Sequence, residues 1–284
     1  MKRVHLVHII PNDKLHIFHG YDEIIETIRW GLAQLGCEVT YAINQFEPHS
    51  MNIVFGAQML GVEHLKRIPA NSIIYNLEQA TGIKPESLRD SYRYCAEHLQ
   101  IWDYSELNLP TWERFASAKR PLHVPIGYAP ILSRIPKPEK QEIDVLFYGG
   151  PGGERLRIFH DLCSNLVRTV FVHGLYGKSR DDLISKSKIV LNINQYPEFG
   201  VFEIVRASYL LANSKAIVSD VSSTSKIEPD IRNAVRFCAL EQVVSQCLDL
   251  LDDDATRARL ENDGFKAISK RDIRMILQNT AIDL

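Results

Sequence analysis

The stretch KSKIVLNINQYPEFGVFEIVRASYLLANSKAIVSD, Lys186–Asp220, contains two apolar runs that each end in polar residues. KIVLNIN ends in Asn192 and Asn194, and KAIVSD ends in Asp220. Between them, FEIVRASYLLAN places apolar residues at helical spacing. A strand, a helix and a second strand in this order predict a βαβ unit with parallel strands.

The polar residues of this stretch are concentrated in one connection, between the first strand and the helix. Ligands of open parallel sheets bind beyond the carboxyl ends of the strands. We therefore expect a site formed by Asn192, Asn194 and the start of the helix, where Phe202, Glu203 and Arg206 lie. An acid and a base on one helical turn suit a polyhydroxylated, anionic ligand.

Outside this stretch, the same alternation of strands and helices extends over the chain and predicts two α/β halves. In the first half, VHLVHII, DEIIETIRWGLAQLG and CEVTYAI indicate strand, helix and strand. Further elements of the first half are strands at 52–57, 72–78, 99–105 and 123–128 and a helix at 87–97. The second half begins with a strand at DVLFYG and continues with a helix at 154–166, strands at 169–173 and 234–239, and helices at 240–251 and 255–269.

A proline-rich segment separates the two halves. APILSRIPKPEKQ, residues 129–141, has three prolines and little apolar periodicity, which is typical of a linker. We expect a first domain at 1–130, a linker at 131–141 and a second domain at 142–284.

Composition indicates an ordinary globular protein and excludes several functional classes. Of 284 residues, 45% are hydrophobic and 24% charged, and the formal net charge of −2 provides no basic face for DNA or RNA. The five cysteines are scattered and show no metal-ligand spacing. No segment approaches 18 apolar residues, and the first apolar run reads as a strand rather than a signal peptide, so we expect a cytoplasmic protein.

Two connections of the second half carry candidate phosphate ligands. FYGGPGGERLR places Gly149 and Gly150 after a strand and before a helix, where backbone N–H groups and Arg155 favour an anion. GLYGKSRDD places Lys178 and Arg180 in what we expect to be a second loop, next to Tyr176. In each case the alternative is structural: a tight strand-to-helix turn, and a solvated turn. LDDDAT, residues 251–256, reads as a helix end and an N-cap rather than a metal motif.

These pieces resemble the GT-B glycosyltransferases, and more closely the bacterial enzymes known as group 1 sugar transferases, whose pattern is of the type VLNxxxY…FExxRxSYLLAN…VVSE. The quoted stretch carries the likeness, together with IYNLEQ, IWDYSELN, VPIGYAP, DVLFYGG and GLYGKSRDDLI in the same order along the chain. The resemblance implies two Rossmann-like domains with parallel sheets facing a central cleft, and a last helix that returns to the first domain.

The resemblance also implies a reaction: transfer of a sugar from a nucleotide-diphosphate donor to a hydroxyl acceptor, without a metal or other cofactor, in polysaccharide or glycoconjugate assembly. The donor would lie in the second half, at the glycine turn, Tyr176, Lys178, Arg180 and the residues of the βαβ unit. Retaining GT-B enzymes carry two glutamates eight positions apart, whereas eight positions after Glu198 this chain has Arg206. Glu203 is our candidate for the remaining carboxylate.

In an inverting enzyme of this kind, a base from the first half would deprotonate the acceptor hydroxyl. The candidates at the carboxyl ends of predicted strands are His19, Asp22, Glu78 and Asp103, and we prefer His19 and Glu78. For each of them a structural role, as a turn, cap or satisfied polar group, is the alternative. His5 and His8 occupy positions within the first strand, where we expect them to satisfy local hydrogen bonds.

Two other functions remain open. A non-catalytic nucleotide-sugar-binding protein or degenerate partner subunit would bind the donor without turnover. A sugar-nucleotide epimerase would turn over without an acceptor. A nicotinamide dehydrogenase is disfavoured because no GxGxxG motif opens either half.

Overall fold

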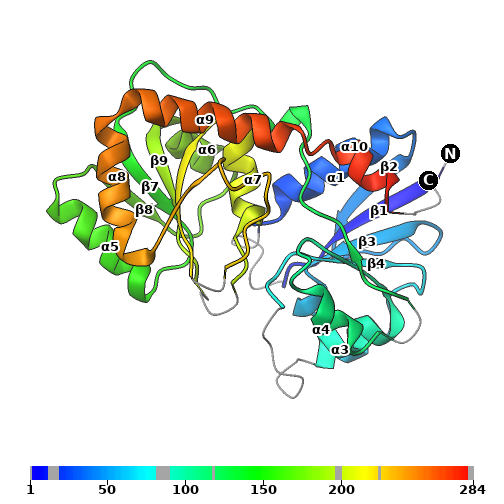
Figure 1. The fold of residues 1–284 in the computed structure, drawn as a ribbon. Helices are drawn as coiled ribbons and strands as arrows, with labels where there is room; N and C mark the ends of the chain where they lie inside the picture. The colour runs from blue at the N-terminus through cyan, green and yellow to red at the C-terminus, as the bar shows by residue number, and fades with distance from the viewer. Residues whose placement is uncertain are drawn as a thin grey trace. The chain divides into compact units, whose positions relative to one another are not determined.

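A computed structural model describes residues 2–11, 19–80, 90–116, 119–195, 200–222 and 225–280. The chain divides into two compact units (Figure 1). Unit 1 comprises residues 1–129 and 272–284, and unit 2 comprises residues 130–271. The chain therefore passes from unit 1 into unit 2 and back again.

Unit 1 is built on a six-stranded parallel sheet in the order β2-β1-β3-β4-β5-β6. Its strands are β1 (Arg3–His8), β2 (Glu38–Ile43), β3 (Met51–Phe55), β4 (Ile73–Asn76), β5 (Gln100–Asp103) and β6 (Leu122–His123). The central strands are rich in Ile and Val and are buried, as expected of a parallel sheet covered on both faces.

Helices cover the two faces of this sheet. α2 (Val62–Leu65), α3 (Asp90–His98), α4 (Leu109–Glu113) and the short η2 (Ala57–Met59) share a core with one face, through residues such as Val7, Val54, Tyr92 and Trp112. α1 (Asp22–Gln34) contacts β2 and packs beside α10 (Ile273–Gln278).

The packing of α10 against the rest of unit 1 requires glycine at two positions. A Cβ added to Gly31 of α1 would lie 2.8 Å from Leu277 Cδ1, and one added to Gly127 would lie 2.8 Å from Ile273 Cδ1 and 3.1 Å from its Cα. Ile273 and Leu277 are both buried. The absence of side chains at Gly31 and Gly127 therefore lets α10 pack closely against the residues of unit 1 that come before unit 2 in the chain.

Unit 2 is built on a five-stranded parallel sheet in the order β11-β10-β9-β7-β8. Its strands are β7 (Ile143–Tyr148), β8 (Thr169–Val172), β9 (Ser187–Asn192), β10 (Ala216–Asp220) and β11 (Arg236–Cys238). Its helices are η4 (Pro130–Leu132), α5 (Gly153–Ser164), α6 (Gly177–Lys186), α7 (Ile204–Ala212), η6 (Leu240–Gln242), α8 (Val243–Asp252) and α9 (Asp254–Ser269).

One face of this sheet packs on α5 and α8, through residues such as Phe147, Ile158, Leu191 and Leu250. α6 contacts β7 and β9, α7 contacts β9 and β10, and α9 contacts β10. α7 and α9 also pack against each other. The segment predicted as a linker is bound to the end of α7: Ser133 donates to the Ala212 carbonyl at 2.8 Å, and Asn213 Oδ1 accepts from the Arg134 and Ile135 amides at 2.8 Å.

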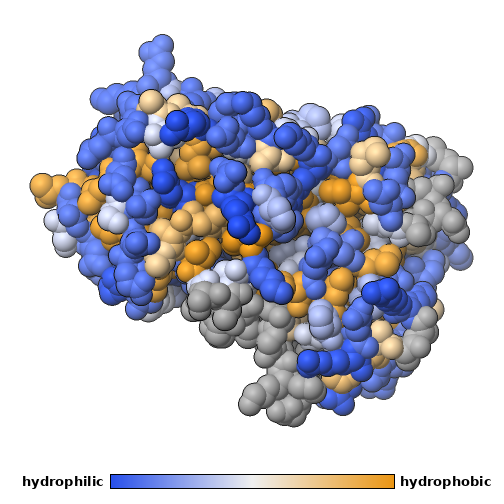
Figure 2. Space-filling view, in the orientation of Figure 1, coloured by the Kyte–Doolittle hydropathy of each residue, from blue (hydrophilic) through white to orange (hydrophobic). Residues whose placement is uncertain are grey.

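Two parallel α/β sheets were predicted, and this fold class is confirmed. The strand predicted at 123–128 was wrong in extent, because β6 pairs with β5 only at Leu122 and His123. Part of the helix predicted at 87–97 lies outside the described residues, and α3 begins at Asp90. On the face shown in Figure 2, hydrophilic side chains lie among smaller groups of hydrophobic ones. None of the helices in the described ranges combines the length and hydrophobicity that crossing a bilayer requires.

Candidate functional site

The predicted ligand site of unit 2 contains a cavity at the carboxyl edge of the sheet. β7, β9 and β10 are neighbours and end at Tyr148, Asn192 and Asp220. The cavity has a volume of about 390 Å³ and lies where the turns after these strands meet. Its lining residues are Pro151, Gly152, Gly153, Glu154, Arg155, Asn194, Gln195, Asp220 and Leu240.

The first turn of α5 presents backbone donors to this cavity. α5 begins at Gly153, and its N-cap residue is Gly152, so no N-cap side chain accepts hydrogen bonds from the first backbone N–H groups of the helix. The N–H groups at the start of a helix point away from the helix and favour an anion. A phosphate group in the cavity would therefore meet a partly positive wall formed by the backbone.

Arg155 holds the walls of the cavity together. Its guanidinium donates to the Ile193 carbonyl at 2.6 and 3.0 Å, to the Gly150 carbonyl at 3.0 Å and to Gln195 Oε1 at 3.1 Å. Only 6% of the residue is exposed. These bonds join the turn after β7 to the turn after β9, so Arg155 acts mainly as a positioning residue.

Asn194 and Asp220 give the cavity acceptor oxygens. Asp220 Oδ1 accepts from the Asn194 amide at 2.7 Å, and burial raises the pKa of Asp220, partly offset by this bond. Asn194 Oδ1 is buried and has no hydrogen-bond partner among the described residues. A buried carbonyl oxygen without a partner favours a ligand that brings a donor, such as a hydroxyl or an N–H group.

Arg206 lies beside the glycine turn. Its Nη1 is 3.5 Å from Asn192 Oδ1, and its guanidinium lies near the rings of Phe147 and Tyr148, at 6.0 and 5.8 Å. Within the described ranges it pairs with no carboxylate. Gly149 has φ +154°, a backbone conformation that favours glycine, and a Cβ there would be in ordinary contact with Arg206 Nη2, at 3.5 Å.

Asn192 and Glu203 flank Arg206. Asn192 is buried and donates to the Ser219 hydroxyl at 3.0 Å, which fixes its orientation. Glu203 is the half-buried N-cap residue of α7, one position before the helix in which it was predicted. Its carboxylate forms no hydrogen bond or ion pair with the residues that the structure describes.

The expected loop carrying Lys178 and Arg180 is a helix, and this prediction was wrong. Both residues lie in α6, whose N-cap residue is Tyr176 and whose first residue, Gly177, has φ +59°. The Lys178 side chain is 89% exposed and pairs with Asp182 one turn later, at 3.1 Å.

Arg180 and Phe202 are buried by other side chains of unit 2. Arg180 donates to Asp181 at 2.8 Å and lies over the Tyr209 ring at 4.8 Å. Phe202 packs edge-on against Phe237, with the ring centroids 5.0 Å apart. Both side chains therefore serve packing in this structure, and neither lines the cavity.

In unit 1, His19 and Asp22 form a pair at the carboxyl end of β1. His19 Nδ1 lies 2.9 Å from Asp22 Oδ2, and about a third of each side chain is exposed. His8, the last residue of β1, lies with its Nδ1 3.5 Å from Asp22 Oδ1. Burial raises the pKa of Asp22, an effect that the neighbouring His19 opposes.

The expectation that His8 satisfies local hydrogen bonds was wrong. His5 meets it, through Thr40 Oγ1 at 2.7 Å and the Gln45 carbonyl at 3.1 Å. His8 is fully buried, and neither of its ring nitrogens is hydrogen-bonded within the described ranges. Burial, together with the charge of His19, lowers the pKa of His8 to about 4, so this ring is neutral near pH 7.

Glu78, the second preferred base, is bound to the segment that carries His19. The buried Tyr21 hydroxyl donates a short hydrogen bond to Glu78 Oε1 and accepts one from Gln58 Nε2 at 3.1 Å. The structure thus brings Glu78 to Tyr21, which lies between His19 and Asp22 in the chain. His16, three positions before His19 in the sequence, lies outside the described residues.

Asp103 and Asp253 have structural roles. Asp103 is fully buried and accepts four hydrogen bonds, from Asn76, Asn108, Trp112 and the Ser105 amide. Burial raises its pKa to about 7, against the effect of these donors. Asp253 caps α9, as predicted, by accepting from the Thr256 amide at 2.8 Å. The described residues contain no group of three or more His, Cys, Asp and Glu side chains placed to hold a metal ion.

Comparisons with known sequences find distant relatives of unknown role. No family model matches the chain. It is 24% identical over 260 residues to the uncharacterized protein R358 of Acanthamoeba polyphaga mimivirus, covering 89% of each chain. Matches to L138 and L140 of the same virus are 24% and 26% identical over 66% and 64% of this chain, which spans only 21% and 60% of their lengths.

Comparisons with solved structures identify the fold. HepE of Anabaena, crystallised with UDP-glucose, superposes with a TM-score of 0.63 at 10% identity over 97% of each chain. AviGT4, a glycosyltransferase of avilamycin A biosynthesis, has a TM-score of 0.61 at 12% identity, over 98% of this chain and 96% of AviGT4. WaaG, a glycosyltransferase of lipopolysaccharide biosynthesis, has a TM-score of 0.59 at 10% identity, over 99% and 98% of the two chains. The chain has the two-domain GT-B fold of these glycosyltransferases.

Proposed function

We propose that this protein is a glycosyltransferase that transfers a sugar from a nucleotide-diphosphate donor to a hydroxyl group of a saccharide or similar acceptor. The observation that carries the proposal is the cavity of unit 2, which combines backbone donors at one wall with acceptor oxygens at another. A nucleotide sugar has both matching parts: a diphosphate, and hydroxyl and N–H groups on its ribose, base and sugar.

The diphosphate would meet the first turn of α5 and Arg206. As the bond between the sugar and the diphosphate breaks, negative charge grows on the leaving phosphate, and fixed donors stabilise that charge. Arg206 supports this role because it lies beside Gly149 and is paired with no carboxylate among the described residues. Lys178 and Arg180 have no role in the proposal, because one is exposed and the other is bound to Asp181.

The acceptor oxygens would recognise the uncharged parts of the donor. Asn194 Oδ1 needs a donor, and Asp220 lines the same cavity. Glu203 would accept from a sugar or ribose hydroxyl near the start of α7. We propose that the donor is bound without a metal ion.

His19 would act as the base that removes the proton from the acceptor hydroxyl. Asp22, 2.9 Å away, would orient the ring and stabilise the imidazolium that forms. His8 lies near the other oxygen of Asp22 but is buried and neutral. The negative charge of Asp22 would therefore be available to stabilise a protonated His19. Glu78 remains the alternative base. Saccharide assembly in the cytoplasm is the setting we propose for the reaction.

Calorimetric titration with UDP, UDP-glucose and the corresponding GDP, dTDP and ADP compounds, with and without EDTA, tests the donor site. We expect saturable binding of one nucleoside diphosphate that EDTA does not change. Arg206→Ala should weaken it at least tenfold, about 1.4 kcal/mol, whereas the matched control Lys178→Ala should leave it unchanged. Equal effects of the two substitutions would contradict our assignment of Arg206.

A second measurement, of UDP release from the bound donor in the presence of saccharide acceptors, tests the base. His19→Gln should slow turnover by about 10²-fold or more with unchanged donor affinity, since general bases contribute that much. Normal turnover in this variant would move the role to Glu78.

A nucleotide-sugar-binding protein without turnover is the second candidate. The absence of a second glutamate eight positions after Glu198 favours it, because retaining GT-B enzymes carry both. It predicts tight UDP-sugar binding with no UDP release for any acceptor.

A further inference from the structure

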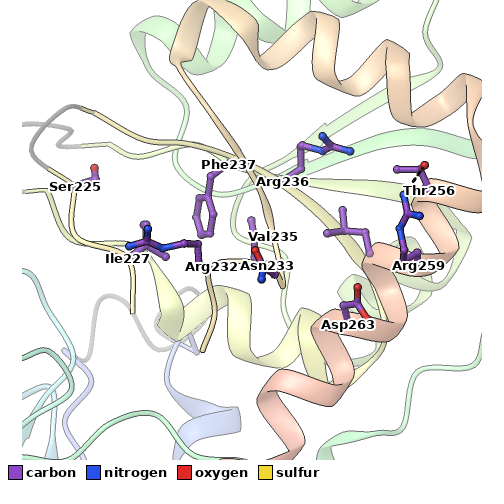
Figure 3. Close-up of a pocket in the computed structure, with 11 residues that line it drawn as sticks. Ser225, Ile227, Arg232, Asn233, Val235, Arg236, Phe237, Thr256, Arg259 and Asp263 are labelled. Carbon is purple, nitrogen blue, oxygen red and sulfur yellow. Dashed lines mark hydrogen bonds between the residues drawn. The ribbon is translucent and has the colours of Figure 1, made fainter. Parts of the chain in front are cut away.

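Unit 2 contains a second cavity, of about 580 Å³, beside its edge strand β11 (Figure 3). It is lined by Ser225, Ile227, Arg232, Asn233, Val235, Arg236, Phe237, Thr256, Arg259, Leu260 and Asp263. None of these residues lines the cavity at the ends of β7, β9 and β10. The proposed donor site therefore makes no use of this second cavity.

Three arginines from separate parts of the chain line it. Arg232 precedes β11, Arg236 is the first residue of β11, and Arg259 lies on α9, as Figure 3 shows. Asp263 is the one acidic residue of the lining. The formal charge of the lining is thus three positive charges against one negative.

None of these arginines forms a salt bridge within the described ranges, although the pKa of the nearby Asp253 is lowered by hydrogen bonds from Thr256 and, to a smaller extent, by the charge of Arg259. Arg259 donates only to Thr256 Oγ1, at 3.1 Å. By contrast, Arg257 on the same helix pairs with Asp254, and Arg271 pairs with Glu228 and Asp230. A positive residue on an edge strand can prevent pairing with strands of other molecules, and this role would account for Arg236 on β11. The same role does not account for Arg232 and Arg259, which are not on the strand.

The rest of the lining is suited to an organic group. Ile227, Val235 and Leu260 provide apolar surface, and Phe237 provides an aromatic ring. Guanidinium groups bind phosphate in a two-pronged geometry, and an excess of two positive charges matches a phosphate dianion. A ligand that carries both a phosphate and an apolar part would use both kinds of surface.

We propose that this cavity binds the phosphate group of a second, phosphorylated ligand, distinct from the nucleotide donor. That phosphate belongs either to a free phosphorylated molecule or to a lipid head group. The proposal rests on the residues around β11 and α9 and does not depend on the proposed sugar transfer.

Inorganic pyrophosphate, titrated by calorimetry into the full chain in the presence of UDP, is the first probe. We expect Arg236→Gln/Arg259→Gln to weaken pyrophosphate binding at least tenfold and Asp263→Asn to strengthen it severalfold, because Asp263 repels an anion. Arg157→Gln, an exposed arginine paired on α5, is the matched control and should change nothing. The gain in Asp263→Asn is decisive even if the double variant folds poorly.

Vesicle sedimentation separates the two sources of phosphate. Binding to phosphatidylglycerol vesicles but not to phosphatidylcholine vesicles, lost in the double variant, would identify a lipid head group. Pyrophosphate binding without vesicle binding would identify a free ligand.

Three results would overturn the proposal: no binding of either probe, binding that the double variant and Asp263→Asn leave unchanged, or pyrophosphate binding that only Arg206→Ala removes. UDP affinity, measured on the same variants, should stay constant. If the wild-type protein does not bind UDP, the proposed donor site is contradicted. The test of this second cavity is unaffected by that result.

Discussion

Replacing Arg155 by alanine should destabilise unit 2 strongly, even though Arg155 is a charged residue on a helix next to an open cavity. The substitution removes four hydrogen bonds and a contact with the Phe147 ring at 5.4 Å, and it leaves the Ile193 carbonyl without its two guanidinium donors. Removing one partner of a buried, charged network costs about 3–5 kcal/mol. We expect a loss of this size for Arg155→Ala, and about half of it for Arg155→Lys, which keeps the charge but has a single nitrogen.

Arg157, two positions later on the same helix, is the matched control. Its side chain is nearly half exposed, and it pairs with Glu154 at 2.6 Å and Asp161 at 2.9 Å across the helix surface. Such pairs contribute about 0–1 kcal/mol, so Arg157→Ala should unfold close to the wild-type midpoint. Guanidinium chloride unfolding followed by circular dichroism measures both variants, and UDP calorimetry shows whether the turns still form the cavity. Similar midpoints for Arg155→Ala and Arg157→Ala would refute our account of Arg155.

Lys215 is almost fully buried, and burial lowers its pKa to about 8. Between pH 8 and its unfolded value of 10.5, the unfolded chain binds a proton that the folded chain does not, so stability should rise with pH in this window, by about 3 kcal/mol in total. Lys215→Met should remove this rise, and the difference between the denaturation midpoints of the two proteins at pH 7.5 and pH 10 measures it; a constant difference would contradict the prediction. Gly127→Ala should destabilise unit 1 by about 1–3 kcal/mol, because the added Cβ meets the backbone of Ile273. Gly61→Ala, where the nearest atom to the added Cβ is 4.0 Å away, is the control, and thermal unfolding measures both variants. An equal loss of stability in the two variants would show that α10 moves away from the added Cβ at little energetic cost.

The fold could be predicted because its signals are local. Each strand of unit 2 is a short apolar run between polar turns, and the helices other than α6 have an apolar face, so order and parallel pairing follow from the sequence. α6 was missed because Leu183 and Ile184 are its only apolar side chains. β6 was predicted too long because the segment 124–128 has buried apolar side chains, such as Ile126, but turns away from β5. The Val124 amide still donates to the Asp103 carbonyl of β5, whereas Tyr128 forms its bridge with Asp272.

The site was less predictable, because exposure and partners decide which polar side chains are available. Lys178, Arg180 and Arg155 have the same charge, yet one is solvated, one is bound to Asp181 and one ties two turns together. His8 and Asp220 were given little or no weight. Their position at strand ends was a usable signal for both, but the contact of His8 with Asp22 depends on tertiary packing that no local pattern encodes.

The position of α10 has a consequence for how the protein is made. Residues 1–129 of unit 1 leave the ribosome before unit 2, but the Gly31 and Gly127 surfaces are completed only by Ile273 and Leu277, more than 140 residues after Gly127. All of unit 2 is synthesised in between and can fold within itself. Unit 1 therefore begins before unit 2 and is completed after it, and until α10 is made the surfaces at Gly31 and Gly127 lack the helix that covers them.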